Sequence, residues 1–248
     1  MGEYVGWFLD AARWSGTAGI PNRLTEHVVL TGVSMVLACA VALPVGIGLG
    51  HLGRGGAVTL TVSNASRAVP TFAVLILAVV AFGFGFLPNV LALTLFAIPP
   101  VLANAYVGTA GVDRDAKEAA RGMGMSGWQV LRRVEVPLAL PLVAAGIRTS
   151  TVQVIATATL AAYVGSGGLG RYIRDGFAVR DLPAVFGGAL LVALLALTAE
   201  LLLGLLQRRL TPGRAAAVRP GATQTPGGGE PGGRRPPERA ATVRVPAG

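Results

Sequence analysis

Long stretches without a charged residue are the feature that most constrains this chain. No Asp, Glu, Lys or Arg lies between Glu26 and Arg54, and the 45 residues from Ala68 to Val112 contain none either. A helix of about 20 apolar residues crosses a hydrocarbon core about 30 Å thick. Because helices satisfy their own backbone groups in lipid, the sequence predicts an all-α, polytopic membrane protein.

The uncharged runs divide into five expected spans. The run from Ala68 to Val112 is too long for one span and fits two spans joined by a reversal at Gly83–Asn89, since Gly and Pro interrupt helices. The other runs are each expected to cross once. The five expected spans are His27–Gly50, Val62–Phe82, Pro88–Val107, Val136–Val164 and Pro183–Leu206.

Charge is scarce and unevenly placed. Charged residues make up 13% of the chain, about half the fraction of an ordinary soluble domain, which argues against a soluble enzyme. Eight of the 21 basic residues follow Leu206 in a Pro/Gly-rich stretch, so the net charge of +9 does not describe a nucleic-acid-binding face. Residues 207–248 have few large apolar side chains, and we expect a disordered basic tail.

The distribution of Lys and Arg predicts the orientation. With five spans, Arg54, the segment Asp113–Glu135 and the C-terminus share one side, which carries nine basic residues against five on the other side. We therefore expect this segment and the tail to be cytoplasmic. Residues 1–26 are then extracytoplasmic.

The sequence has too few Cys, His and Lys residues to build several common kinds of enzyme site. Cys39 is the only cysteine, and His27 and His51 are the only histidines, so we expect no metal site and no catalytic residue. The Gly165–Gly170 run matches GxGxxG but follows an expected membrane helix instead of a strand. The only lysine, Lys117, is not followed by Ser or Thr, so this chain has no phosphate-binding loop and any ATP would be bound by a partner.

The segment Asp113–Glu135 is the one long polar stretch inside the chain. Its small residues would let another protein approach closely, and Gly122 and Gly124 allow a sharp turn before a second, amphipathic helix. We expect Trp128, Val130, Leu131 and Val134 near one face of that helix, and Pro137 at the start of the next span. The pattern predicts a helical elbow on the membrane surface that docks a partner. An ordinary amphipathic helix that only stabilises the fold is the alternative.

The spacing of this segment resembles the EAA loop of permease subunits of binding-protein-dependent ABC importers. That motif is Glu-Ala-Ala, three residues, Gly, nine residues, Ile, one residue and Leu-Pro. Here Val134 and Val136 replace the Ile and the Leu, and the other five specified positions are identical. The resemblance implies a type I ABC importer permease fold and an ATPase-coupling role for Glu118, Ala119, Ala120, Gly122, Gly124, Trp128, Val134, Val136 and Pro137.

The resemblance also implies partners and a solute class. Four segments look like osmoprotectant permeases for glycine betaine, carnitine, choline or proline: Glu118–Leu140, Ala145–Thr149, Ala156–Ala161 and Gly165–Gly170. The resemblance covers residues 27–206 as a transmembrane permease domain. It implies ATP-hydrolysing subunits, an extracytoplasmic solute-binding protein and a second permease subunit. A permease for another solute, such as an amino acid or an organosulfonate, and a scaffold without transport activity are the alternatives.

Polar residues within the expected spans are candidates for the translocation pathway. Thr149, Gln153 and Thr157 recur every four residues beside Arg148, and Arg67 lies just before Pro70. Such groups either line a wet cavity or bond between packed helices. Glu200 is expected at the membrane interface. An external loop for close backbone approach is expected at Gly165, Gly167, Gly168 and Gly170.

Overall fold

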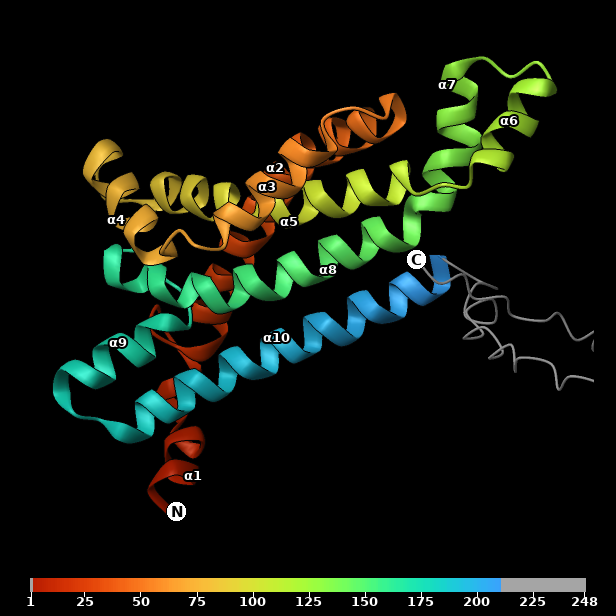
Figure 1. Cartoon of the computed structure of the whole chain (residues 1–248). Helices are drawn as coiled ribbons and strands as arrows, with labels where there is room; N and C mark the ends of the chain where they lie inside the picture. The colour runs from red at the N-terminus through yellow and green to blue at the C-terminus, as the bar shows by residue number, and fades with distance from the viewer. Residues whose placement is uncertain (1, 211–248) are drawn as a thin grey trace, which may run out of the picture. The chain divides into compact units, whose positions relative to one another are not determined.

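The computed structural model describes residues 2–210, and every regular element in this range is helical (Figure 1). Of the expected tail, 207–248, residues 211–248 lie outside the described residues, whereas residues 207–210 are the helical end of α10, which runs four residues past the expected end of the fifth span. The elements are α1 Gly2–Leu9, η1 Ala11–Trp14, α2 Ile20–Leu52, α3 Gly56–Ser66, α4 Thr71–Phe82, α5 Phe86–Ala110, α6 Arg114–Gly122, α7 Gly127–Val130, the π-helical turn η2 Leu131–Glu135, α8 Val136–Ala161, η3 Ala162–Val164, α9 Gly170–Val179 and α10 Leu182–Leu210.

Within residues 2–210, four helical stretches are long and apolar enough to cross a membrane, and a bent pair can supply a fifth pass. The four are α2, α5, the stretch Gly127–Val164 and α10; the pair is α3 with α4. The passes alternate in direction, so that α1 and α9 lie at one end, the loop end, and α6 and α7 lie at the other, the elbow end (Figure 1). The expected order of five passes is confirmed in this form.

The second expected span is wrong as a single helix. The chain begins the pass at Gly56 and bends by 88° between α3 and α4. Pro70 explains the break, because it lacks a backbone N–H and disfavours helical geometry at the preceding residue. The reversal that follows is confirmed, with Gly83 and Gly85 both at positive φ.

The expected fourth span is the continuation of the elbow's second helix. Helix runs without a break from Gly127 to Val164, through the π-turn η2, in which the Val136 N–H donates to the Leu131 carbonyl. The ring of Pro137 would clash with the carbonyl four residues earlier in a regular α-helix, and a wider turn at this point avoids that contact. Pro137 therefore lies inside one long helix instead of starting a new one.

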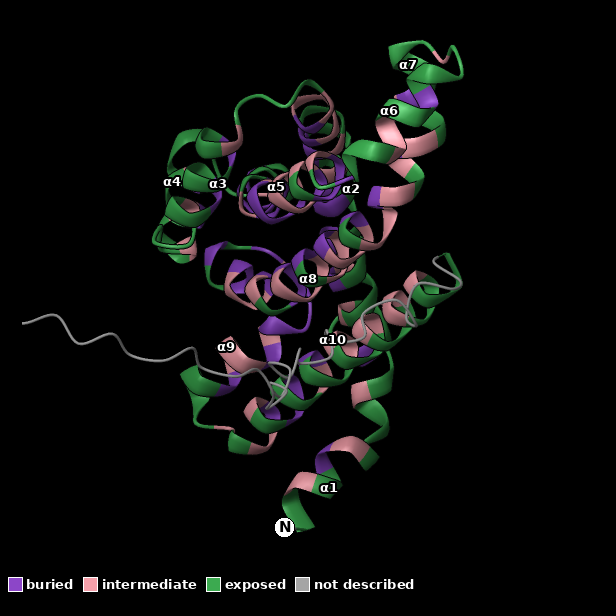
Figure 2. Ribbon diagram, turned by 45° about the vertical axis from the view of Figure 1, so that its right-hand side comes forward, coloured by how far each residue is buried: buried purple, intermediate pink, exposed green. Residues whose placement is uncertain are grey.

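Helix α5 forms the centre of the bundle, with α2 and α8 packed against it (Figure 2). Small residues let these helices approach closely: a Cβ at Gly46 would lie 2.7 Å from the Leu102 carbonyl oxygen, and one at Gly146 would lie 2.5 Å from the Asn104 Cβ. This is the usual device at helix crossings in membranes. Helix α10 is peripheral, and few of its residues are buried.

Candidate functional site

The segment 113–137 folds into a helix, a tight turn and a second helix, as expected. Asp113 caps α6 by accepting from the Asp115 N–H at 2.8 Å. Gly124 then takes a φ of 80°, a conformation open to glycine at little cost. Ser126 and Gln129 form a reciprocal capping box that starts α7. The elbow therefore has a defined shape set by its own local sequence.

The outer surface of the elbow carries small residues, a glutamate and two large apolar side chains. Met123 at the turn is 72% exposed and Trp128 at the start of α7 is 67% exposed. Glu118, Ala119, Gly122 and Gly124 are also exposed. Exposed Trp and Met on a polar segment are typical of protein interfaces, so this surface is suited to docking a partner protein.

The inner surface of the elbow is buried against the bundle. Ala120 and Val130 are almost fully inaccessible, whereas Val134 and Val136 are half-buried. The expectation that Trp128 shares a face with Val130 and Val134 is wrong. At 100° per residue, Trp128 lies on the opposite side of the helix from Val130, and it points away from the bundle.

A buried cluster of charged and ionisable side chains joins the elbow to the ends of two spans. Glu135 has no exposed surface, and its Oε2 lies 2.6 Å from Nδ1 of His51 in the last turn of α2. Its Oε1 lies 3.5 Å from Nζ of Lys117 on α6. The Lys117 ammonium also donates to the carbonyl of Thr109, near the end of α5, at 3.2 Å. Four elements thus meet at one carboxylate.

Sequence reasoning missed this cluster. The sequence pattern indicates Glu135 only as the end of a polar segment, and His51 only as the end of a span. The signal available in the sequence was Glu135 itself, an acid next to Val136 and Pro137 where apolar sequence resumes, because a carboxylate at such a boundary is rarely buried without a partner.

The candidate pathway residues on α8 separate onto two faces. Arg148 faces α10, where its Nε lies 3.3 Å from Oε1 of Glu200, and a Cβ at Gly204 would approach its guanidinium at 3.3 Å. Thr149 is exposed, and Gln153 and Thr157 are half-buried beside it. The Thr157 hydroxyl donates to the Gln153 carbonyl at 2.8 Å. At 100° per residue, the centre of this polar stripe (Thr149, Gln153 and Thr157) lies about 140° around α8 from Arg148, so the stripe does not share the face that pairs with α10.

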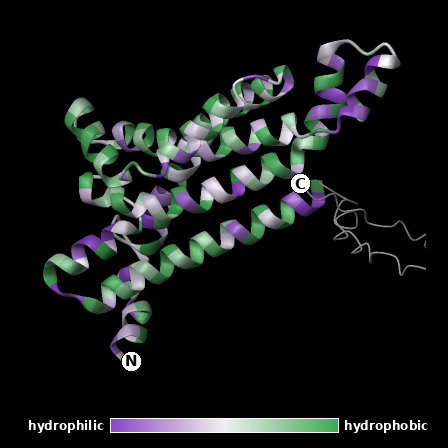
Figure 3. Ribbon diagram, in the orientation of Figure 1, coloured by the Kyte–Doolittle hydropathy of each residue, from purple (hydrophilic) through white to green (hydrophobic). Residues whose placement is uncertain are grey.

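Arg67 does not lie within a straight span. It is the exposed C-terminal cap of α3, at the bend between α3 and α4. The structure therefore does not bring it together with Arg148 or the polar stripe into one described cluster. Figure 3 places the hydrophilic residues mainly on α6, α7 and α9, with hydrophobic residues along α10.

The glycine loop, Gly165–Gly170, packs against the start of α2. The Gly168 N–H donates to Oε2 of Glu26 at 2.7 Å, and a Cβ at Gly167 would overlap the same carboxylate. Gly165 and Gly168 have positive φ, and a Cβ at Gly170 would overlap the Thr159 carbonyl oxygen. Close backbone approach at this loop is what the sequence led us to expect.

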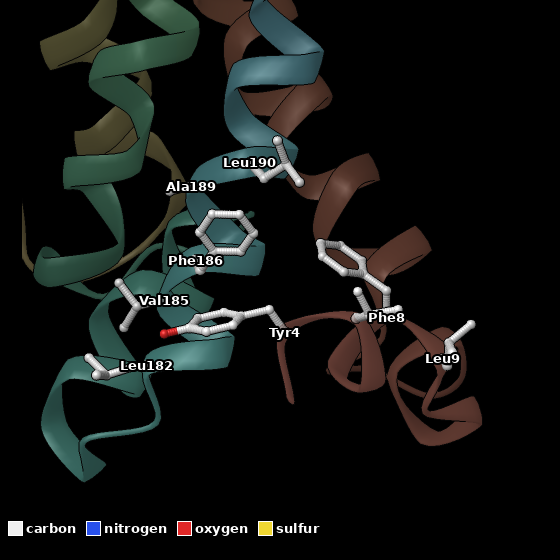
Figure 4. Close-up of a pocket in the computed structure, with 9 residues that line it drawn as sticks. Tyr4, Phe8, Leu9, Leu182, Val185, Phe186, Ala189 and Leu190 are labelled. Atoms are coloured by element: carbon white, nitrogen blue, oxygen red, sulfur yellow. The ribbon is translucent and has the colours of Figure 1, made fainter. Parts of the chain in front are cut away.

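Several hollows lie at the loop end of the described chain. One, of about 380 Å³, is lined by Glu26, Ser166 and the glycine loop. Another is an apolar groove of about 880 Å³ between α1 and α10, where the rings of Tyr4 and Phe186 lie 5.2 Å apart (Figure 4). Tyr4 is the only one of its nine lining residues with a polar side-chain atom, so the groove offers little to a charged solute.

The arrangement of apolar passes with a polar elbow at one end is that of a multi-pass membrane protein. A family model described as the binding-protein-dependent transport system inner membrane component matches residues 42–212. This match covers more than half of the chain. The chain therefore belongs to this family of transport permeases.

Curated relatives and solved structures agree with that assignment. The chain is 37% identical to the glycine betaine/carnitine/choline transport system permease protein OpuCB of Bacillus subtilis, over 75% of this chain and 86% of the relative. It is 39% identical to the carnitine transport permease protein OpuCB of Listeria monocytogenes, over 79% of this chain and 90% of the relative. The fold matches a chain of the inward-facing MetNI methionine ABC transporter with a TM-score of 0.67 and 21% identity, over 77% of this chain and 96% of that one.

Proposed function

We propose that this chain is the membrane-spanning permease subunit of an ATP-driven importer of small osmoprotectants such as glycine betaine, choline, carnitine or proline. The relatives named for these solutes carry the assignment of the solute class. Quaternary ammonium groups are usually held in aromatic cages. Only 6% of this chain is aromatic, so selective binding is assigned to a separate extracytoplasmic binding protein.

The elbow is the proposed docking site for an ATPase subunit, which binds the ATP. The observation that carries this assignment is the exposed surface around Met123 and Trp128, on a segment with defined turns and a buried opposite face. Helix continues from α7 into α8, so a displacement of the docked elbow reaches the bundle directly. Glu118, Ala119 and Gly122 would lie within the contact.

The polar stripe on α8 is the proposed pathway lining. Thr149 is exposed and Gln153 and Thr157 are half-buried, on a face of α8 other than the one from which Arg148 reaches α10. A second permease subunit, either a copy of this chain or a paralogue, would enclose that face. The distribution of Lys and Arg supports a cytoplasmic elbow and C-terminus, with residues 1–26 outside.

Reconstitution tests the coupling role. The permease, its ATPase and its binding protein are placed in proteoliposomes, and uptake of labelled glycine betaine and ATP hydrolysis are measured. Glu118→Ala combined with Gly124→Pro should abolish uptake, because proline cannot adopt the positive φ at Gly124. Trp128→Ala should weaken uptake while leaving the fold intact, since the side chain is exposed.

The matched control is Gly6→Ala in α1, because nothing lies within 4 Å of a Cβ built at that position and the residue lies at the loop end, outside the proposed contact. Uptake that persists in both the double variant and Trp128→Ala would refute the coupling role. Competition by choline, carnitine and proline, but not by methionine, is expected for the solute class. Competition by methionine alone would contradict it.

A further inference from the structure

We propose that Glu135, His51 and Lys117 form a latch that makes the elbow and the ends of α2 and α5 move as one unit during coupling. In this role Glu135 is a positioning residue that acts through the elbow. The proposal rests on the elbow being the ATPase-docking site. It adds a specific set of side chains that transmits the movement to two spans.

The contacts of Glu135 reach helices that are distant in sequence. His51 precedes it by 84 positions and ends α2, yet the His51 Nδ1 lies 2.6 Å from Glu135 Oε2. Lys117 lies on α6. Its ammonium group donates a hydrogen bond to the Thr109 carbonyl of α5 and forms an ion pair with Glu135 at 3.5 Å. The carboxylate therefore connects both helices of the elbow to the ends of two separate passes.

Electrostatics opposes opening this cluster one contact at a time. Glu135 is inaccessible to water, and a buried carboxylate separated from its partners is strongly disfavoured. The Lys117 ammonium also lies at the C-terminal end of α5, where the helix dipole favours a positive charge. Moving the elbow away from α2 and α5 would remove these compensations together, so concerted movement costs less.

The π-turn places Glu135 where the latch needs it. In a regular α-helix, residues five apart are about 140° apart around the axis, so Val130 and Glu135 would lie on different faces. Both are fully buried here, because the turn η2 between them has i to i+5 hydrogen bonding. Such π-turns are frequent at functional sites. The local backbone thus directs a carboxylate into the bundle just where the elbow joins α8.

The test uses the reconstituted transporter with Glu135→Gln, Lys117→Met and the double variant. Glutamine keeps the shape of the side chain and removes its charge. We expect basal ATP hydrolysis to be retained and the solute transported per ATP to fall about fivefold or more, the lower end of typical coupling between sites. If the two groups act as one latch, the double variant should be no worse than either single variant.

Asp175→Asn is the matched control, because Asp175 is paired with Arg171 and Arg174 at the loop end, away from the elbow. A second readout is the distance between spin labels at Arg121→Cys, an exposed position on α6, and Leu52→Cys in a Cys39→Ala background, with and without nucleotide. That distance should stay constant in the otherwise unchanged protein and vary with nucleotide in Glu135→Gln.

The outcomes separate the latch from the proposed function. Unchanged transport per ATP and an unchanged label distance in Glu135→Gln would overturn the latch and leave the permease function standing. Additive losses in the double variant would also overturn it. A transporter without any ATP-driven uptake before substitution would refute both the proposed function and the latch.

Discussion

Two glutamates at opposite ends of the bundle hold the chain together by different means. At the elbow end Glu135 is fully buried, its Oε2 pairs with His51 of α2, and its Oε1 faces the Lys117 ammonium of α6 at 3.5 Å without a hydrogen bond. At the loop end the Glu26 side chain is 37% exposed and bonds to Arg23 of its own helix and to the Gly168 N–H. The elbow end thus depends on paired charges. The loop end depends on a backbone N–H, that of Gly168, which can approach the Glu26 carboxylate because the loop is rich in glycines, which have no side chains.

The largest expected effect is at the buried glutamate. Glu135→Ala removes the carboxylate and leaves Lys117 facing a cavity, which should cost about 3–5 kcal/mol. Thermal unfolding of the purified permease in detergent measures the loss. Glu26→Ala should cost clearly less, since its site is open to water. Equal losses at the two sites would break the comparison.

The next effect is expected in the glycine loop. Gly167→Ala places a Cβ against the Glu26 carboxylate, which is the far end of a flexible side chain, so we expect a cost at the low end of overpacking, about 1 kcal/mol. The loss should shrink when Glu26→Ala is added, because the obstructing carboxylate is then absent. A double-mutant cycle on the unfolding temperature measures the coupling. Strict additivity would show that the loop end does not depend on this approach.

A similar effect is expected at Tyr172, which closes the loop end from α9. Its hydroxyl donates to the Ala18 carbonyl at 2.6 Å, and burial raises the pKa of this phenol. Tyr172→Phe should therefore cost about 1 kcal/mol. A raised pKa means that the neutral donor is favoured, so stability should show no loss between pH 7 and pH 9 from this group. A steep loss over that range, absent in Tyr172→Phe, would contradict the assignment.

The smallest effect is expected on the elbow's outer surface. Arg114 and Glu118 form an exposed i, i+4 pair at 2.9 Å, and such pairs contribute about 0.3–0.5 kcal/mol at most. Arg114→Ala should leave the unfolding temperature nearly unchanged in low and high salt. A large loss of stability would mean that the outer surface of the elbow is structural and not a free docking face.

The features set by local sequence could be predicted. The passes follow from uncharged runs, and the elbow follows from Gly124 and its flanking helices. The bend between α3 and α4 had a visible local signal in Pro70, which was outweighed by the uniform hydrophobicity around it. Local patterns of this kind report the backbone well, because they act within a few residues.

The features set by distant contacts could not be predicted. The pairing of His51 with Glu135 spans 84 positions, and the pairing of Arg148 with Glu200 joins two separate passes. The sequence predicts the wrong helix face for Trp128. The π-turn η2 then changes the register of the helix that follows it. Only the packed bundle decides which of these polar groups meet.

The unbroken helix from Gly127 to Val164 has a mechanical consequence. Its longer arm, α8 with η3 (Val136–Val164), extends about 43 Å at 1.5 Å per residue, and α7 is set at an angle to that arm at the elbow end (Figure 1). If the arm pivots near its middle by about 10°, its two tips shift by about 4 Å in opposite directions. A displacement of the elbow at Trp128 would then widen or narrow the hollow beside Gly165, at the opposite end of the same helix.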